Sequence, residues 1–167
     1  MVDQNQIDAK TIAQELLDET GAALLSGDFK RFAPHFFLPQ VLSLEEEKVL
    51  VSTEEELRAT FENRYAFFAS MKIDVIHRYI DSAAYVSPTQ IHSTHVSDLL
   101  SGANRLRGPY PVFSILRLVE GKWVIEMSDY AVPANSCEGL ALKSSGTVLP
   151  KTRPIASQTP LPIGEEE

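Results

Sequence analysis

The chain has 167 residues, of which 44% are hydrophobic, 23% charged and 8% aromatic, and its formal net charge is −8. This length and composition are those of one globular domain, and they exclude a disordered or fibrous chain. The negative charge repels phosphate backbones and anionic lipids, and the longest apolar runs span only a few residues, so we expect neither nucleic-acid binding nor a membrane span.

Two helices are predicted at the start of the chain. Residues 8–26 repeat apolar side chains at helical spacing, and Gly27 follows where a helix often ends in the left-handed conformation. Asp28 is then placed to cap a short second helix, which carries three phenylalanines and ends where two prolines interrupt the pattern.

A hairpin and a third helix follow. Residues 41–44 and 49–51 are short β-rich runs on either side of a charged turn. Thr53 and Glu56 form a capping box, which predicts a helix that ends near Met71. Four side chains share one face of this helix: Leu57, Phe61, Tyr65 and Phe68.

Strands dominate the next part of the chain. The pattern predicts four successive antiparallel strands over 73–80, 84–100, 111–119 and 122–132, separated by Asp-Ser, Ser-Gly-Ala-Asn and Glu-Gly turn signals. Helices followed by strands predict an α+β domain over residues 1–132.

The remaining residues, 133–167, contain five of the ten prolines and no sustained period, which predicts an irregular C-terminal tail. This segment holds the single cysteine, Cys137, so an intramolecular disulfide is excluded. The acidic N-terminal segment lacks the features of a signal peptide, and we therefore expect a cytoplasmic location.

The order of elements and the segment Gly121-Lys122-Trp123-Val124-Ile125 resemble the NTF2-like superfamily, particularly its SnoaL-like proteins. The resemblance covers roughly residues 8–132. It implies a cone-shaped α+β fold in which a strongly curved antiparallel sheet wraps around three N-terminal helices. It also implies an apolar pocket at the wide end and dimerisation through the outer face of the sheet.

The last hairpin indicates which side chains line that pocket. If Glu120-Gly121 is a two-residue turn, Leu118 pairs with Trp123. Continuing the count places one set of pairs on the concave face: Leu118/Trp123, Leu116/Ile125, Ser114/Met127 and Val112/Asp129. A bulge in this hairpin would turn the residues beyond it to the opposite face.

Asp129 is the candidate catalytic residue. A carboxylate on an apolar wall can act as a general base or acid, as in the steroid isomerases and polyketide cyclases that the chain resembles. The alternative is a structural carboxylate that accepts hydrogen bonds at the strand end. By approximate alignment the isomerase triad is absent, since Thr20 and Ser114 stand at two of its positions.

Further ligand-binding candidates are His95, Ser114, Tyr65, Trp123 and Met127. His95 shares a strand face with Ser93 and Ser97, whereas His92 points to the other face, so these histidines cannot chelate one metal ion without a bulge between them. No metal site is expected. Tyr65 lies on the apolar stripe of its helix, where it packs in the core or directs its hydroxyl into the pocket.

These residues leave three functions open. The first is a proton-transfer enzyme, of isomerase, cyclase or dehydratase type, that acts without a cofactor on a small apolar substrate with Asp129 as base. The second is a non-catalytic small-ligand-binding module. The third is a protein-interaction domain that uses the outer sheet face, where four side chains predict a homodimer: Phe113, Ile115, Val124 and Tyr130.

Overall fold

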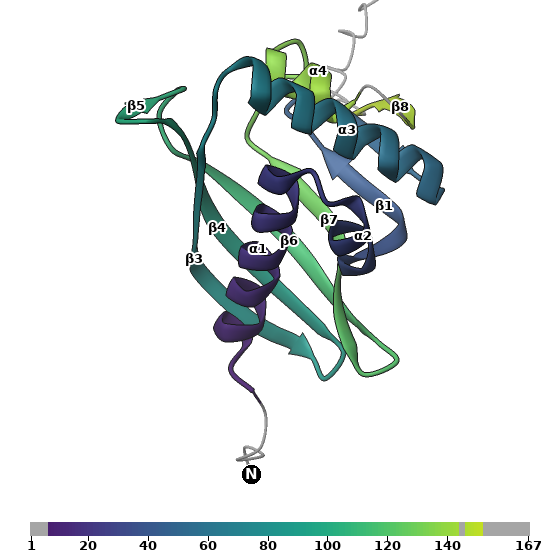
Figure 1. Ribbon diagram of the computed structural model, residues 1–167. Helices are drawn as coiled ribbons and strands as arrows, with labels where there is room; N and C mark the ends of the chain where they lie inside the picture. The colour runs from purple at the N-terminus through teal and green to yellow at the C-terminus, as the bar shows by residue number, and fades with distance from the viewer. Residues whose placement is uncertain (1–6, 144–145, 152–167) are drawn as a thin grey trace, which may run out of the picture.

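The computed structural model describes residues 7–143 and 146–151. Helices and strands form largely separate runs along the chain, in an α+β arrangement (Figure 1). The helices are α1 (Ala9–Ser26), α2 (Phe29–Phe32), the 3-10 turn η1 (Ala33–His35), α3 (Glu54–Ser70) and α4 (Cys137–Leu142). The strands are β1 (Phe36–Ser43), β2 (Glu47–Val51), β3 (Val75–Ser87), β4 (Gln90–Ser101), β5 (Asn104–Arg105), β6 (Tyr110–Val119), β7 (Lys122–Tyr130) and β8 (Thr147–Pro150).

The strands form one sheet in the order β3-β4-β6-β7-β1-β2-β8, with β5 paired to β4. All pairs are antiparallel except β1 and β7, which run parallel. The predicted α+β cone is confirmed, but the sheet is mixed and not wholly antiparallel as expected. The parallel pair arises because the chain passes from β1 through β2, α3 and three long strands before β7 returns beside β1.

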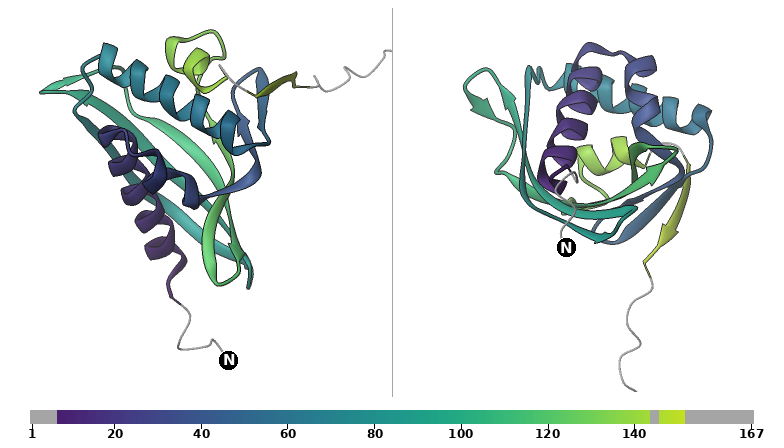
Figure 2. Two further views of the ribbon diagram at one scale, coloured as in Figure 1. Left: turned by 45° about the vertical axis from the view of Figure 1, so that its right-hand side comes forward. Right: turned by 90° about the horizontal axis from the view of Figure 1, so that it is seen from below.

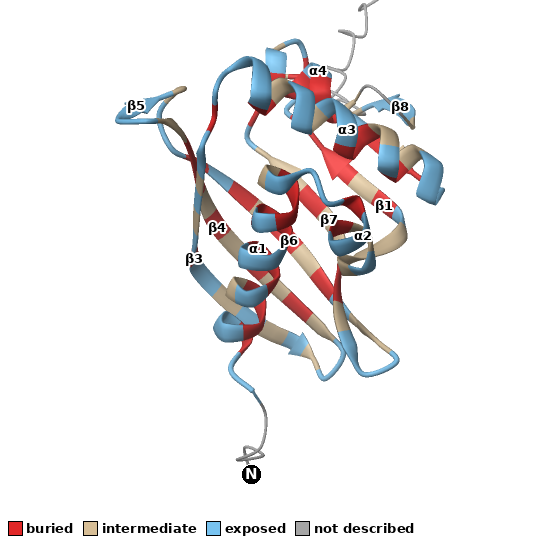
Figure 3. Cartoon of the chain, viewed as in Figure 1, coloured by how far each residue is buried: buried red, intermediate tan, exposed pale blue. Residues whose placement is uncertain are grey.

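The sheet curves around α1, and α3 crosses its upper end (Figure 2). Buried residues lie along α1 and along the strands of the sheet that it packs on (Figure 3). Two apolar clusters fill it. The larger lies beneath α2 and α3 around Phe61, and the smaller lies between the first half of α1 and the sheet around Ile91.

The helix ends agree with the local sequence signals. Gly27 is left-handed at the end of α1, with φ of 70°. The Asp28 carboxylate accepts a hydrogen bond from the Arg31 amide at 3.1 Å, and the Thr53 hydroxyl accepts one from the Glu56 amide at 3.1 Å. Such caps satisfy amides that have no partner within the helix, and so they fix where each helix begins.

One predicted turn is wrong. Asp81 and Ser82 lie inside β3, where the pairing with β4 shifts register between Ile80 and Ser82. The chain reverses direction later, at Pro88 and Thr89. Polar residues at an irregularity within a strand and at a turn give the same sequence signal, because both positions face water.

The C-terminal segment contains structure that the prediction of an irregular tail missed. Helix α4 packs against the core, with Leu142 fully buried, and β8 pairs antiparallel with β2. The predicted tail is therefore wrong over these two elements, while residues 152–167 lie outside the described part of the chain. Among the described helices, none has the length and apolar character needed to span a bilayer.

Candidate ligand site inside the cone

The hairpin of β6 and β7 decides which side chains enter the cone. Glu120 and Gly121 form the expected two-residue turn, with φ of 50° and 76°, and Val119 pairs with Lys122. The pairing then shifts, since Leu116 faces Ile125 whereas Ile115 faces Met127. Glu126 is thus the extra residue of a bulge in β7.

The bulge reverses the predicted orientation of the last part of β7. Ser128 replaces Met127 as the partner of Ser114 on the concave face, and their hydroxyl oxygens lie 3.3 Å apart. Met127 and Asp129 face outward. The Asp129 side chain is 44% exposed and lies 3.9 Å from Lys151 Nζ, so the expected position of this carboxylate on the pocket wall is wrong.

A cavity of about 20 Å³ lies at the polar centre of the concave face. It is lined by residues of α1, α2, α3 and five strands, and none of the lining residues is acidic. Its polar residues are Thr20, Arg64, Arg78, His95, Ser114, Ser128 and Tyr130, and its apolar residues are Leu17, Leu24, Phe32, Phe36 and Ile125.

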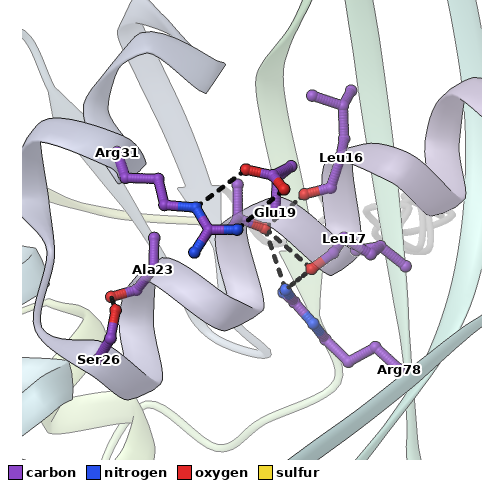
Figure 4. Close-up of polar contacts among 8 residues, drawn as sticks. Leu16, Leu17, Glu19, Ala23, Ser26, Arg31 and Arg78 are labelled. Carbon is purple, nitrogen blue, oxygen red and sulfur yellow. Dashed lines mark hydrogen bonds and ion pairs between the residues drawn. The ribbon is translucent and has the colours of Figure 1, made fainter.

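Arg78 reaches this cavity from β3 by extending beneath α1 (Figure 4). Its Nη2 donates to the Leu17 carbonyl and, at 3.0 Å, to the Thr20 hydroxyl. Gly21 leaves room for the guanidinium, because a Cβ at that position would lie 2.8 Å from Nη2. Burial, together with the charge of Arg64, lowers the pKa of Arg78 to about 10.

Arg64 adds a second positive charge to the cavity lining, and His95 adds a neutral imidazole. The Arg64 guanidinium carbon lies 5.8 Å from the ring centres of both Phe68 and Tyr130, and its buried Nε has no hydrogen-bond partner. His95 is 4% exposed, and its Nδ1 also lacks a partner. Burial and the charges of Arg78 and Arg64 lower the pKa of His95 to about 3, so its imidazole is neutral at pH 7.

The strand register brings these groups together. Ser93 pairs with Ser114, which pairs with Ser128, so three inward serines cross β4, β6 and β7 in one row. The next inward row of the sheet contains His95, which pairs with Val112, which in turn pairs with Tyr130. Residues from distant parts of the sequence thereby meet at one place on the concave face.

Of the six predicted site residues, His95 and Ser114 line the cavity. Trp123 is on the predicted face but packs at the narrow end, where its ring meets Tyr85 edge-on at 5.8 Å. Tyr65 is 43% exposed, and its expected position in the core is wrong. Its ring instead covers Gly27, where a Cβ would lie 3.2 Å away.

Two of the residues that the prediction missed are Arg64 and Arg78. A usable signal existed for Arg78, because it alternates with Ile76 and Ile80, which both face the core side of β3. Arg64 gave no such signal, since it lies one position away from the apolar stripe of α3.

Larger hollows occur on the surface. A groove of about 420 Å³ lies between α2 and α3, beside Phe29, Leu57 and Arg58. The Arg58 guanidinium there is exposed and rests on the Phe29 ring, 4.2 Å from its centre. None of the residues around this groove has a buried polar atom without a partner, and so the interior cavity is the better ligand site. Within the described residues, no three His, Cys, Asp or Glu side chains gather closely enough to hold a metal ion.

Comparison with known proteins identifies similar folds but no similar sequence. No protein-family model matches the chain, and no curated protein matches it. A solved NTF2-like protein of unknown function from Shewanella oneidensis is 15% identical, with a TM-score of 0.59 over 72% of this chain and 97% of the other.

Two further solved structures are similar to the same degree. A protein of unknown function from Mycobacterium tuberculosis is 15% identical, with a TM-score of 0.59 over 82% of this chain and 90% of the other. An NTF2-like protein with a cystatin-like fold from Novosphingobium aromaticivorans is 15% identical, with a TM-score of 0.56 over 80% of this chain and 88% of the other. At these identities the likeness concerns the fold.

Proposed function

Because this chain has the NTF2-like fold and a polar cavity inside its cone, we propose that it is a non-catalytic binding protein for a small polar molecule. The supporting observation is that two buried nitrogens on cavity-lining residues, Arg64 Nε and His95 Nδ1, have no hydrogen-bond partner. An unpaired buried polar atom costs roughly 1–3 kcal/mol. A ligand that pairs with these nitrogens recovers that free energy.

Binding is favoured over proton transfer because the cavity contains no suitable base. Asp129, the candidate base, lies on the outer face, and no acidic residue lines the cavity. His95 is a weak base, since its pKa is lowered to about 3. A general base for chemistry at neutral pH needs a pKa nearer 7.

The test is a binding screen with small solutes, both neutral and charged, followed by calorimetry: urea, formamide, acetamide, formate and acetate. We expect at least one to bind. Ser128→Val should abolish this binding, because its two methyl groups occupy the cavity and remove a hydroxyl. Asp129→Asn should bind as the wild type does, because its side chain lies outside.

The matched control is Ser93→Val, which makes the same change at an equally buried serine on the concave face that does not line the cavity. This variant should keep the affinity of the wild type. If no solute binds, or if Ser128→Val binds as well as Ser93→Val, the interior cavity is not a binding site.

We also propose that the outer face of the sheet, which takes no part in the cavity, forms a homodimer interface. Phe113, Ile115 and Met127 are half-buried on this face, and the helices cover only the opposite side (Figure 2). Two of the four predicted contact residues need correction. Tyr130 points into the cone and lines the cavity. Val124 is buried within the single chain, with 7% of its surface exposed, so it has little area left for a partner.

A further inference from the structure

Arg78 and Arg64 are two cavity-lining cations without an acidic partner. Neither forms an ion pair with a carboxylate in the described part of the chain. Arg31, by contrast, is exposed and forms an ion pair with the Glu19 carboxylate. Its Nη2 and Nε donate to that carboxylate at 2.9 and 3.0 Å (Figure 4). The fold therefore gives the exposed Arg31 a carboxylate partner and gives the two cavity arginines none among the described residues.

The hydrogen bonds of Arg78 engage only one of its three nitrogens. Nη2 donates to the Leu17 carbonyl and the Thr20 hydroxyl, whereas Nε and Nη1 donate to no acceptor among the described residues. A guanidinium carries five N–H donors in a fork that matches an oxyanion with two oxygens. Arg78 thus retains two nitrogens without an acceptor in the described part of the chain, although neither is among the buried unpaired atoms, as Arg64 Nε is.

Like charges meet here without compensation. Arg64 and Arg78 repel each other, and both disfavour a proton on His95. The carboxylate that raises the pKa of Arg78, against burial and Arg64, is that of Asp18, an exposed residue of α1 that accepts a hydrogen bond from Gln14. An anion in the cavity would relieve this repulsion and hydrogen-bond the free donors.

We propose that the cavity binds a small monovalent oxyanion, a carboxylate of one or two carbons or a group of the same shape, on Arg78 and Arg64. The proposal rests on the proposed binding function and names its ligand class. Ser114 and Ser128 supply hydroxyls around the anion, whereas the Thr20 hydroxyl donates to the Leu16 carbonyl and holds Arg78 in place. His95 contributes a hydrogen bond as a neutral imidazole.

The size of the cavity limits the anion. A water molecule needs roughly 10–15 Å³ of such volume, and this cavity has about 20 Å³. At rest the cavity therefore holds about one to two water molecules, and an anion of three or four non-hydrogen atoms enters only as the walls move apart. The upper limit of binding free energy per non-hydrogen atom gives a tightest Kd of about 0.5 mM for a three-atom anion and about 0.04 mM for a four-atom anion.

The experiment compares charged and neutral molecules of one shape. Thermal unfolding of the full chain is measured with formate and acetate against formamide and acetamide. Ionic strength is held constant with a sulfonate buffer salt that is too bulky for the cavity. Formate or acetate at about 50 mM should raise Tm by about 5 °C, because ligand that binds only the folded state stabilises it. The amides should raise it far less.

Three variants assign the effect to the cavity. Arg78→Met and Arg64→Met should each weaken the anion affinity about tenfold or more in calorimetry, because each removes charge-assisted donors. Arg58→Met is the matched control, since it removes the same charge from the same helix and also rests on a phenylalanine ring. It should leave the affinity unchanged. Arg64→Met keeps the test decisive if Arg78→Met does not fold.

Equal Tm shifts with the amides and the anions would overturn the oxyanion assignment while leaving the proposed binding function intact. Equal anion effects on Arg64→Met and Arg58→Met would also overturn it, since they would reveal a general salt effect. If no solute shifts Tm, both the oxyanion assignment and the proposed function fail.

Discussion

When the chain folds, the His95 side chain becomes buried in an interior that contains two guanidinium groups. Its pKa falls from 6.5 to about 3 because burial and the charges of Arg78 and Arg64 disfavour the imidazolium. Between these two values the unfolded chain binds a proton that the folded chain does not bind. The folded state therefore loses stability as the pH falls from 6.5 toward 3.

Replacement of His95 by glutamine should remove this loss, because an amide does not titrate. Below pH 6.5 the free energy of unfolding of the wild type should fall relative to that of His95→Gln by about 1.4 kcal/mol per pH unit. Urea unfolding between pH 4.5 and 8 measures the difference. His77→Gln, at an exposed position of β3, is the control and should follow the wild type. Parallel curves for wild type and His95→Gln would contradict the buried, neutral state.

Helix α4, an element of only six residues, is held to the domain by several buried contacts. Ser136 caps it by accepting a hydrogen bond from the Gly139 amide at 3.1 Å, and the buried Glu138 accepts one from the Tyr110 hydroxyl. Arg107 lies 3.7 Å from the same carboxylate and rests on the Tyr110 ring. Burial beside Glu138 raises the pKa of Tyr110, so its hydroxyl remains a donor. The helix thus attaches to β6 through polar groups as well as through Leu142.

Gly139 allows this close packing, and we therefore expect that a larger residue at this position lowers the stability of the fold. A Cβ at this position would lie 2.3 Å from the Pro133 carbonyl oxygen, which belongs to the backbone and cannot easily move. Gly139→Ala should lower the free energy of unfolding by about 1–3 kcal/mol, as overpacking does in other interiors. Gly108→Ala is the control, because nothing lies within 4 Å of its Cβ, and it should change stability by less than about 0.5 kcal/mol. Equal effects in urea unfolding would mean that α4 does not pack as described.

At the scale of the whole molecule, the sheet has one face covered by helices and one without such cover (Figures 1 and 2). Phe113 lies on the uncovered face, where it meets the His92 ring edge-on at 5.3 Å. An apolar patch of this kind on a curved sheet suits a second copy of itself, because a twofold axis brings identical patches together.

The proposed dimer is tested by light scattering on the purified chain. The wild type should have twice the mass of one chain, and Phe113→Glu should have the mass of one, because two carboxylates would meet at the interface. Leu140→Glu is the control, since Leu140 is 52% exposed on α4, and it should remain dimeric. A monomeric wild type would remove the interface proposal and leave the cavity proposals unaffected.

The sequence alone determined the features that depend on local interactions. The caps at Asp28 and Thr53, the left-handed Gly27 and the Glu120-Gly121 turn each depend on a few neighbouring residues, and all four are present. Alternation along β4 likewise placed His95 on the concave face correctly. These features, taken in order, predicted an α+β domain, and the resemblance to the NTF2-like superfamily supplied its cone shape.

Tertiary structure decided the rest of the site. The bulge at Glu126 lies where β7 also pairs with β1, whose own register shifts between Phe36 and Val41. No local signal marks this bulge, because it depends on a strand far away in the sequence, yet it turns Asp129 outward and Tyr130 inward. Arg78 reaches the cavity for a similar reason, since Gly21 on a distant helix provides the space. The family resemblance implied an apolar pocket with a carboxylate on its wall, whereas long-range pairing produced a small cavity whose charged side chains are arginines.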